Sequence, residues 1–99
     1  MSSKLSNSLA DTLEGGDVAL GLLDNTYSPT LVEFCGELGL DFVWLDTEHG
    51  GLDPWTATAM EDLLRAAERT DIELLVRVPD TDPTLVRKAL ELGVRNVFL

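Results

Sequence analysis

The sequence has 99 residues, of which 44% are hydrophobic and 25% are charged, which excludes a disordered chain. Seven Lys and Arg oppose 18 Asp and Glu, and the net charge of −11 argues against nucleic acid and anionic membranes as partners. No apolar run approaches the roughly 20 residues of a membrane span, Met1-Ser2-Ser3-Lys4 does not resemble a secretory signal, and a single cysteine excludes disulfides within the chain. We therefore expect a cytoplasmic protein.

The first predicted element is an N-terminal helix over about residues 5–13, within 1–13. Three further helices share one start signal, since Ser28-Pro29, Asp53-Pro54 and Asp82-Pro83 each place an N-cap residue directly before proline. Apolar residues then recur every three or four positions after each proline, which predicts helices with one buried face. The first and last of these three helices are expected to end at Gly39 and Gly93.

Short apolar runs between the helices predict four strands, over residues 18–23, 42–45, 74–78 and 96–99. Runs of this length without strict alternation are typical of strands that are buried on both faces of a parallel sheet. The helix starts are 25 and 29 residues apart (28, 53 and 82), which is the spacing of βα units. This pattern predicts an α/β fold, either a (β/α) barrel or a doubly wound sheet.

The last predicted strand, residues 96–99, has no helix after it to cover it. Four parallel strands cannot close a barrel, which needs eight strands and about 250 residues. We therefore expect residues 1–99 to form one incomplete barrel domain, the N-terminal part of a longer protein. A complete small α/β protein with an edge strand is the alternative.

Polar residues gather directly after the second predicted strand, in the segment Asp46-Thr47-Glu48-His49-Gly50-Gly51. The carboxyl ends of parallel strands form the functional edge of such folds. His49 is suited to act as a general base, and Asp46 and Glu48 could orient it or hold water around a divalent cation. Asp46 and Glu48, together with Arg77 on the next strand, are also expected to bind substrate. A polar loop that leads into the next helix is the structural alternative.

Arg77 interrupts the apolar run of the third predicted strand. A buried guanidinium needs an anion, which at a strand end could be a substrate carboxylate or an enolate. The structural alternative is a salt bridge from Arg77 to Asp46 or Glu48 on the neighbouring strand.

Other residues are expected to have structural roles. Cys35 lies on the apolar face of a predicted helix and is expected in the core, as is Trp44. Trp55 is expected to cover a loop or to meet a neighbouring subunit. The acidic side chains of Glu61, Asp62, Glu68 and Asp71 are expected to form a solvated surface, and the Lys-poor, acidic composition suggests adaptation to high salt.

The segments 39–51 (GLDFVWLDTEHGG), 75–79 (LVRVP), 82–83 (DP) and 89–93 (ALELG) together resemble the HpcH/HpaI aldolase/citrate lyase family, over about residues 13–99. The resemblance implies a TIM (β/α)8 barrel of the phosphoenolpyruvate/pyruvate type that assembles as a homo-oligomer, usually a hexamer. It implies a metal-dependent aldolase that cleaves 4-hydroxy-2-oxo acids to pyruvate, or a related 2-oxo acid, and an aldehyde.

By the same resemblance, His49 is the catalytic base and Arg77 stabilises the pyruvate enolate. Glu91 stands where the family has an aspartate that raises the basicity of this histidine, although a helix C-terminus in a barrel points away from the catalytic face. The family's ligands for the divalent metal, Mg²⁺ or Mn²⁺ or Co²⁺, would lie beyond Leu99, so we expect none in this chain and little activity from it alone. A non-catalytic barrel fragment that needs a partner chain, and a citrate-lyase-like enzyme that cleaves CoA esters, remain alternatives.

Overall fold

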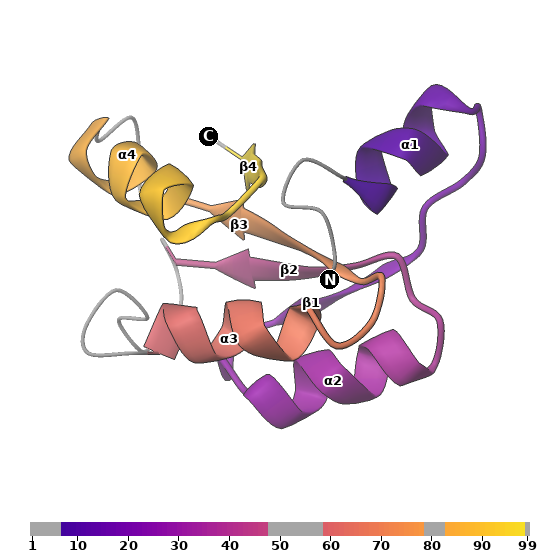
Figure 1. Cartoon of the computed structure of the whole chain (residues 1–99), viewed down its shortest axis with the longest axis horizontal. Coiled ribbons are helices and arrows are strands. Elements are labelled where there is room, and N and C mark those ends of the chain that lie inside the picture. The colour runs from indigo at the N-terminus through magenta and orange to yellow at the C-terminus, as the bar shows by residue number, and fades with distance from the viewer. Residues whose placement is uncertain (1–6, 48–58, 79–82, 99) are drawn as a thin grey trace.

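The chain folds into a parallel sheet of four strands with helices between them, as a computed structural model shows (Figure 1). The structure describes residues 7–47, 59–78 and 83–98. The helices are α1 (Ser8–Glu14), α2 (Pro29–Glu37), α3 (Ala59–Ala67) and α4 (Pro83–Leu92). The strands are β1 (Gly21–Asp24), β2 (Phe42–Asp46), β3 (Glu73–Arg77) and β4 (Asn96–Phe98).

The strands are hydrogen-bonded in the order β1-β2-β3-β4, and every pair is parallel. A doubly wound sheet reverses its strand order at a switch point, whereas a (β/α) barrel adds each strand beside the previous one. The observed order is therefore that of the first strands of a barrel. This confirms the predicted α/β class and decides between its two alternatives.

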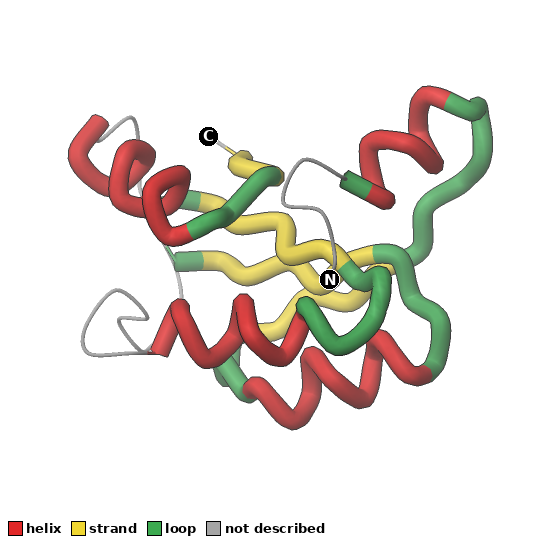
Figure 2. The backbone as a smooth tube through the Cα atoms, in the orientation of Figure 1, coloured by secondary structure: helices red, strands yellow, loops and turns green. Residues whose placement is uncertain are grey.

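Helices α2 and α3 lie side by side along one side of the sheet, as Figures 1 and 2 show. The residues of β2 and β3 that face these helices include Val43, Leu45 and Val76, which are 0% exposed. Residues between them, such as Phe42, Trp44 and Asp46, alternate to the opposite face of β2, which is only half-buried. We call this opposite face, which would line the interior of a barrel, the inner face of the sheet.

Two of the three helix starts predicted at a proline fall within the described residues, and both agree with the structure. Ser28 accepts a hydrogen bond from Leu31 N through its hydroxyl at 3.2 Å, and Pro29 is the first residue of α2. Helix α4 begins at Pro83, and Gly93 follows its last residue with φ of 109°, which side chains rarely adopt. The predicted start at Asp53-Pro54 and Trp55 lie outside the described residues, which resume at Ala59 in α3.

The first strand differs from its prediction. It was expected over residues 18–23, but β1 begins at Gly21 and ends at Asp24. Val18 and Leu20 precede the residues that pair with β2 and are 89% and 64% exposed, so the apolar run did not mark the start of the strand. Strand β3 begins one residue earlier than expected and ends at Arg77, which is thus the last residue of the strand.

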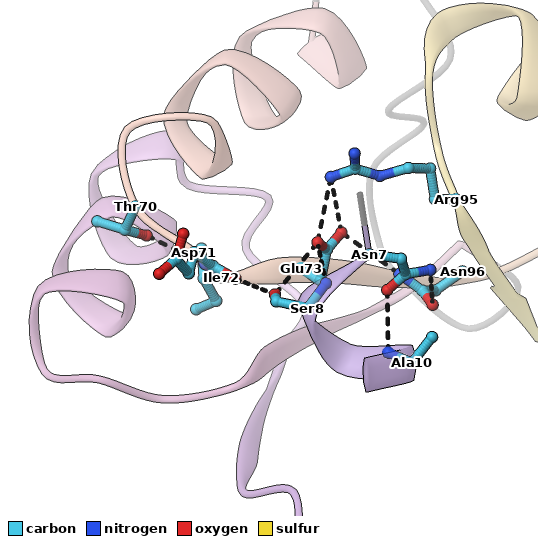
Figure 3. A network of polar contacts seen from close by, with 9 residues as sticks. All are labelled: Asn7, Ser8, Ala10, Thr70, Asp71, Ile72, Glu73, Arg95 and Asn96. Carbon is cyan, nitrogen blue, oxygen red and sulfur yellow. Dashed lines mark hydrogen bonds and ion pairs between the residues drawn. The ribbon is translucent and has the colours of Figure 1, made fainter. Parts of the chain in front are cut away.

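Helix α1 is attached to the start of β3 and β4 by a polar network (Figure 3). The buried carboxylate of Glu73 accepts hydrogen bonds from Ser8 N at 3.2 Å and from Arg95 Nη2 at 3.0 Å. Asn7 Nδ2 donates to Asn96 Oδ1 at 3.0 Å, and Asn7 Oδ1 accepts from Ala10 N as the N-cap of the helix. The described helix spans Ser8–Glu14, and residues 1–6 of the predicted N-terminal helix lie outside the described residues.

Candidate functional site

Asp46 and Arg77 lie next to each other at the carboxyl edge of the sheet. They are the last residues of β2 and β3, and the register of the two strands pairs them directly. Arg77 Nη1 is 3.7 Å from Asp46 Oδ2, and the two side chains are 31% and 13% exposed. The predicted salt bridge between these strands is therefore present, and the Arg77 side chain remains partly exposed.

The main chain around this pair is held by hydrogen bonds from neighbouring loops. Thr47 N donates to Arg77 O at 3.0 Å, and Thr47 Oγ1 donates to the same carbonyl at 2.5 Å. The Tyr27 hydroxyl donates to Asp46 O at 2.5 Å. These bonds fix the ends of β2 and β3 relative to the loop after β1, so that the positions of Asp46 and Arg77 are set by the backbone.

Tyr27 is a residue that the sequence reasoning missed. Its φ of 53° lies in the left-handed region, which is unusual for an aromatic residue and typical of loops at functional edges. The preceding loop turns tightly because Asp24 Oδ1 accepts hydrogen bonds from Thr26 N at 2.8 Å and from Thr26 Oγ1 at 2.6 Å. Asp24 directly after an apolar run is a sequence signal for such a turn.

The other predicted site residues are not brought to this pair within the described part of the chain. Glu48 and His49 lie outside the described residues, so their roles stay predictions. Glu91 lies in the last turn of α4, is exposed, and pairs with Arg87 Nε at 3.8 Å. Because a crossover helix runs back along the sheet, this turn lies near the start of β4, away from the edge that carries Arg77.

A cavity of about 410 Å³ lies at this opposite end of the sheet, and Glu91 is one of its lining residues. Its lining also includes Glu73 and Arg95, which are joined to each other by the network that attaches α1. In α/β barrels this end of the sheet contributes to stability, whereas reactions take place at the carboxyl edge. The cavity is therefore separate from the candidate site.

Cys35 and Trp44 were both expected in the core, but only Cys35 lies there. Cys35 is 2% exposed within the hydrophobic core, and burial, together with the negative charge of Asp24, raises the pKa of its thiol. A raised pKa disfavours the nucleophilic thiolate, which supports the structural role. Trp44 instead lies half-buried on the inner face, because the alternation of β2 turns it away from the helices.

Comparisons with known proteins show that the chain is similar to aldolases. No family model matches the chain. It is 33% identical over 94 residues, or 94% of its length, to a 4-hydroxy-2-oxovalerate aldolase of Novosphingobium aromaticivorans. The chain spans about a third of the length of the curated relatives it matches.

Solved structures give the same result. The chain superposes with a TM-score of 0.82 on an HpcH/HpaI aldolase from Desulfitobacterium hafniense DCB-2, at 27% identity, covering 95% of this chain and 36% of that one. It also superposes on the citrate synthase SbnG with a TM-score of 0.80, at 32% identity, covering 93% of this chain and 36% of that one. No described helix is long and apolar enough to cross a membrane.

Proposed function

Because the homologues of this chain are named aldolases and its structural neighbours are HpcH/HpaI aldolase/citrate lyase family proteins, we propose that it is part of an aldolase. The proposed reaction cleaves a 4-hydroxy-2-oxo acid to pyruvate, or a related 2-oxo acid, and an aldehyde. The observation that carries this proposal is the similarity to a named aldolase over 94% of the chain. The accessible arginine at the carboxyl edge of the sheet supports it.

In the proposed mechanism, His49 accepts the proton of the substrate 4-hydroxyl group. The C3–C4 bond then breaks, its electron pair passes into the enolate of the 2-oxo acid, and the hydroxyl carbon becomes the aldehyde carbonyl. Protonation of the enolate at C3 releases the 2-oxo acid. Arg77 donates hydrogen bonds to the enolate oxygen as its negative charge develops, which is where a fixed cation stabilises the transition state most.

The geometry of Arg77 suits this role. A guanidinium presents planar, paired donors that match a carboxylate or an enolate. Asp46 keeps the guanidinium at the strand end and balances its charge in the free site, at a distance of 3.7 Å that is longer than a hydrogen bond. The contact with Asp46 therefore does not by itself keep the guanidinium from an incoming anion.

A divalent cation, Mg²⁺ or Mn²⁺ or Co²⁺, is part of the proposal for the whole protein, where it would polarise the keto oxygen of the substrate. Residues 7–47, 59–78 and 83–98 contain no group of three or more His, Cys, Asp or Glu side chains that could hold a metal ion. Asp46 lies beside the positive charge of Arg77, which opposes a cation there. The described residues do not fit a metal on their own, and it is the family resemblance that implies ligands beyond Leu99.

The proposal is tested by replacing the two residues that carry the reaction. In the full chain, we expect Arg77→Ala or His49→Ala to lower the rate of pyruvate release from 4-hydroxy-2-oxo acids by at least about 10²-fold. Arg87→Ala, which removes an exposed arginine from α4, is the matched control and should leave the rate unchanged. Pyruvate release at the wild-type rate from either site variant would refute the assignment.

A second candidate follows from the similarity to the citrate synthase SbnG. In this case the same edge of the sheet would serve a reaction of citrate or of a CoA ester rather than of a 4-hydroxy-2-oxo acid. An assay with citrate, and with CoA esters in place of the 2-oxo acid, separates the two candidates. The homo-oligomeric assembly, a hexamer by family resemblance, and the cytoplasmic location stay predictions.

A further inference from the structure

Phe98 completes a row of three residues across the inner face at the carboxyl edge. The strand register aligns Asp46 of β2 with Arg77 of β3, and Arg77 with Phe98 of β4. Arg77 Cζ lies over the Phe98 ring, 5.8 Å from its centroid, which is within the range of a cation–π interaction. The guanidinium therefore lies between a carboxylate on one strand and an aromatic face on the other.

A second aromatic residue supports the Phe98 ring. Trp44 precedes Asp46 by two residues and shares the inner face of β2. The Trp44 and Phe98 rings meet edge to face, with centroids 5.2 Å apart and planes at 86°. Such a pair has a preferred geometry, so Trp44 restricts the orientation of the ring over which Arg77 lies.

The contacts of Arg77 with Asp46 and with Phe98 differ in their effect on the N–H donors of the guanidinium. A carboxylate accepts hydrogen bonds from the N–H groups of a guanidinium. An aromatic face attracts the positive charge of the guanidinium but does not occupy the N–H donors that lie in the guanidinium plane. A contact through the aromatic face leaves the planar donors of a guanidinium able to bind an anion. The Phe98 ring therefore contributes to the orientation of the guanidinium, together with the contact between Arg77 and Asp46.

We propose that Phe98, supported by Trp44, is a positioning residue that orients the Arg77 guanidinium toward the 2-oxo acid. The proposal rests on the proposed function, because it concerns the same site. It assigns no contact with the substrate to Phe98 itself. A leucine or methionine at this position would fill similar space but would remove the aromatic contact with the guanidinium.

The contact itself is tested by nuclear magnetic resonance, independently of any reaction. In the full chain, we expect the Hδ protons of Arg77 to be shifted by the ring current of Phe98, and this shift to disappear in Phe98→Leu and Phe98→Met. Phe98→Tyr should retain it. Phe34→Leu, at a phenylalanine that is 59% exposed on α2, is the matched control and should also retain it. An unchanged shift in both Phe98→Leu and Phe98→Met would overturn the proposal, and a folding failure of one leaves the other as the test.

The functional consequence is tested by kinetics of the proposed retro-aldol reaction. We expect Phe98→Leu to lower kcat by about 10- to 100-fold, the size of effect known for misplaced catalytic groups, while KM changes much less. Phe98→Tyr should restore kcat. Loss of the ring-current shift with an unchanged kcat would overturn the positioning role.

The two proposals fail differently. If the wild-type chain releases no pyruvate from any 4-hydroxy-2-oxo acid, the proposed function fails. The positioning of Arg77 by Phe98 is then tested by titration of the protein with pyruvate. We then expect pyruvate to change the Arg77 Nε–Hε signal at lower concentration in wild type and Phe98→Tyr than in Phe98→Leu. Equal titrations in all three proteins would overturn the positioning role on its own.

Discussion

Arg77 and Asp46 illustrate how a strand register creates a site from residues that are 31 positions apart in the sequence. Each is the last residue of its strand, and parallel pairing places them side by side at 3.7 Å. Both side chains lie on the inner face, where Phe98 and Trp44 complete the surroundings of the guanidinium. The chemistry of the edge therefore depends on where β2 and β3 end.

Cys35 gives a pH dependence to the stability of the fold. Burial and the nearby Asp24 raise the pKa of its thiol, so the folded protein holds this proton more tightly than the unfolded chain. Below the ordinary thiol pKa of about 8.5 both states are protonated and the shift has no effect. Above it the unfolded chain releases the proton first, so the free energy of unfolding should fall as the pH rises.

The measurement is denaturant unfolding between about pH 8 and 9.5, where thiols titrate before most lysines and tyrosines. In Cys35→Ala the decline over this range should be smaller, although the variant is less stable overall because a buried side chain has been shortened. A decline of equal slope in both proteins would show that the thiol does not cause it.

The sequence alone predicted Arg77 and Asp46 of this site but not the aromatic residues around them. Arg77 was identifiable because a charge within an apolar run requires an anion, and Asp46 because it follows such a run. Tyr27 and Phe98 carried no comparable signal, since an aromatic side chain in a loop or a strand is ordinary and only the register shows what it contacts. His49 and Glu48 lie outside the described residues and rest on sequence and resemblance.

At the scale of elements, α1 is joined to the sheet mainly through one buried carboxylate. Glu73 accepts hydrogen bonds from the main-chain N–H of Ser8 and from Arg95, whose Nη2 lies 3.0 and 3.1 Å from its two oxygens. Its residue exposure is 6%, so loss of a partner leaves a charge with little access to water. This network lies at the end of the sheet opposite to Arg77, where it can stabilise the fold without contacting the reaction.

Arg95→Ala should lower the free energy of unfolding by about 1.5–3 kcal/mol, the usual contribution of a hydrogen bond to a charged group. The amide protons of α1 should also exchange faster. Arg65→Ala removes an exposed arginine that pairs with Glu61 at 3.6 Å, and should change stability by less than about 1 kcal/mol. Equal effects of the two variants on stability would show that Glu73 does not depend on Arg95.

Helices were easier to predict than strand bounds. The residue pairs Ser28-Pro29 and Asp82-Pro83 mark helix starts by local chemistry, and α2 and α4 begin at those prolines. The start of β1 depends instead on where β2 pairs with it, so the apolar residues Val18 and Leu20 misled the prediction. The network around Glu73 could not be predicted, because its members come from three distant segments.

For the whole molecule, the sequential parallel order distinguishes a barrel arrangement from a doubly wound sheet. The spacing of helix starts could predict βα units but not this order, because both folds use the same unit. The inner face of the sheet carries half-buried or exposed residues such as Leu23, Trp44 and Phe98. In a barrel, these positions face strands from the other side of the interior.

The charge of the whole chain leads to a prediction about salt. With a net charge of −11, self-repulsion destabilises the compact state at low ionic strength, and salt screens it. We expect the melting temperature to rise between low and molar KCl. A melting temperature that stays constant or falls over this range would exclude adaptation to high salt, and sucrose at matched osmolarity controls for nonspecific effects of the cosolute.

The central claim is that Arg77 stabilises the enolate of a 2-oxo acid, and it can be tested without knowing the aldehyde. The measurement is exchange of the pyruvate methyl protons for deuterium in D₂O, followed by proton nuclear magnetic resonance with the full chain and a divalent cation. We predict that the wild-type protein accelerates this exchange and that Arg77→Ala slows it by at least about 10²-fold, with Arg87→Ala unchanged. Exchange by Arg77→Ala at the wild-type rate would contradict the account.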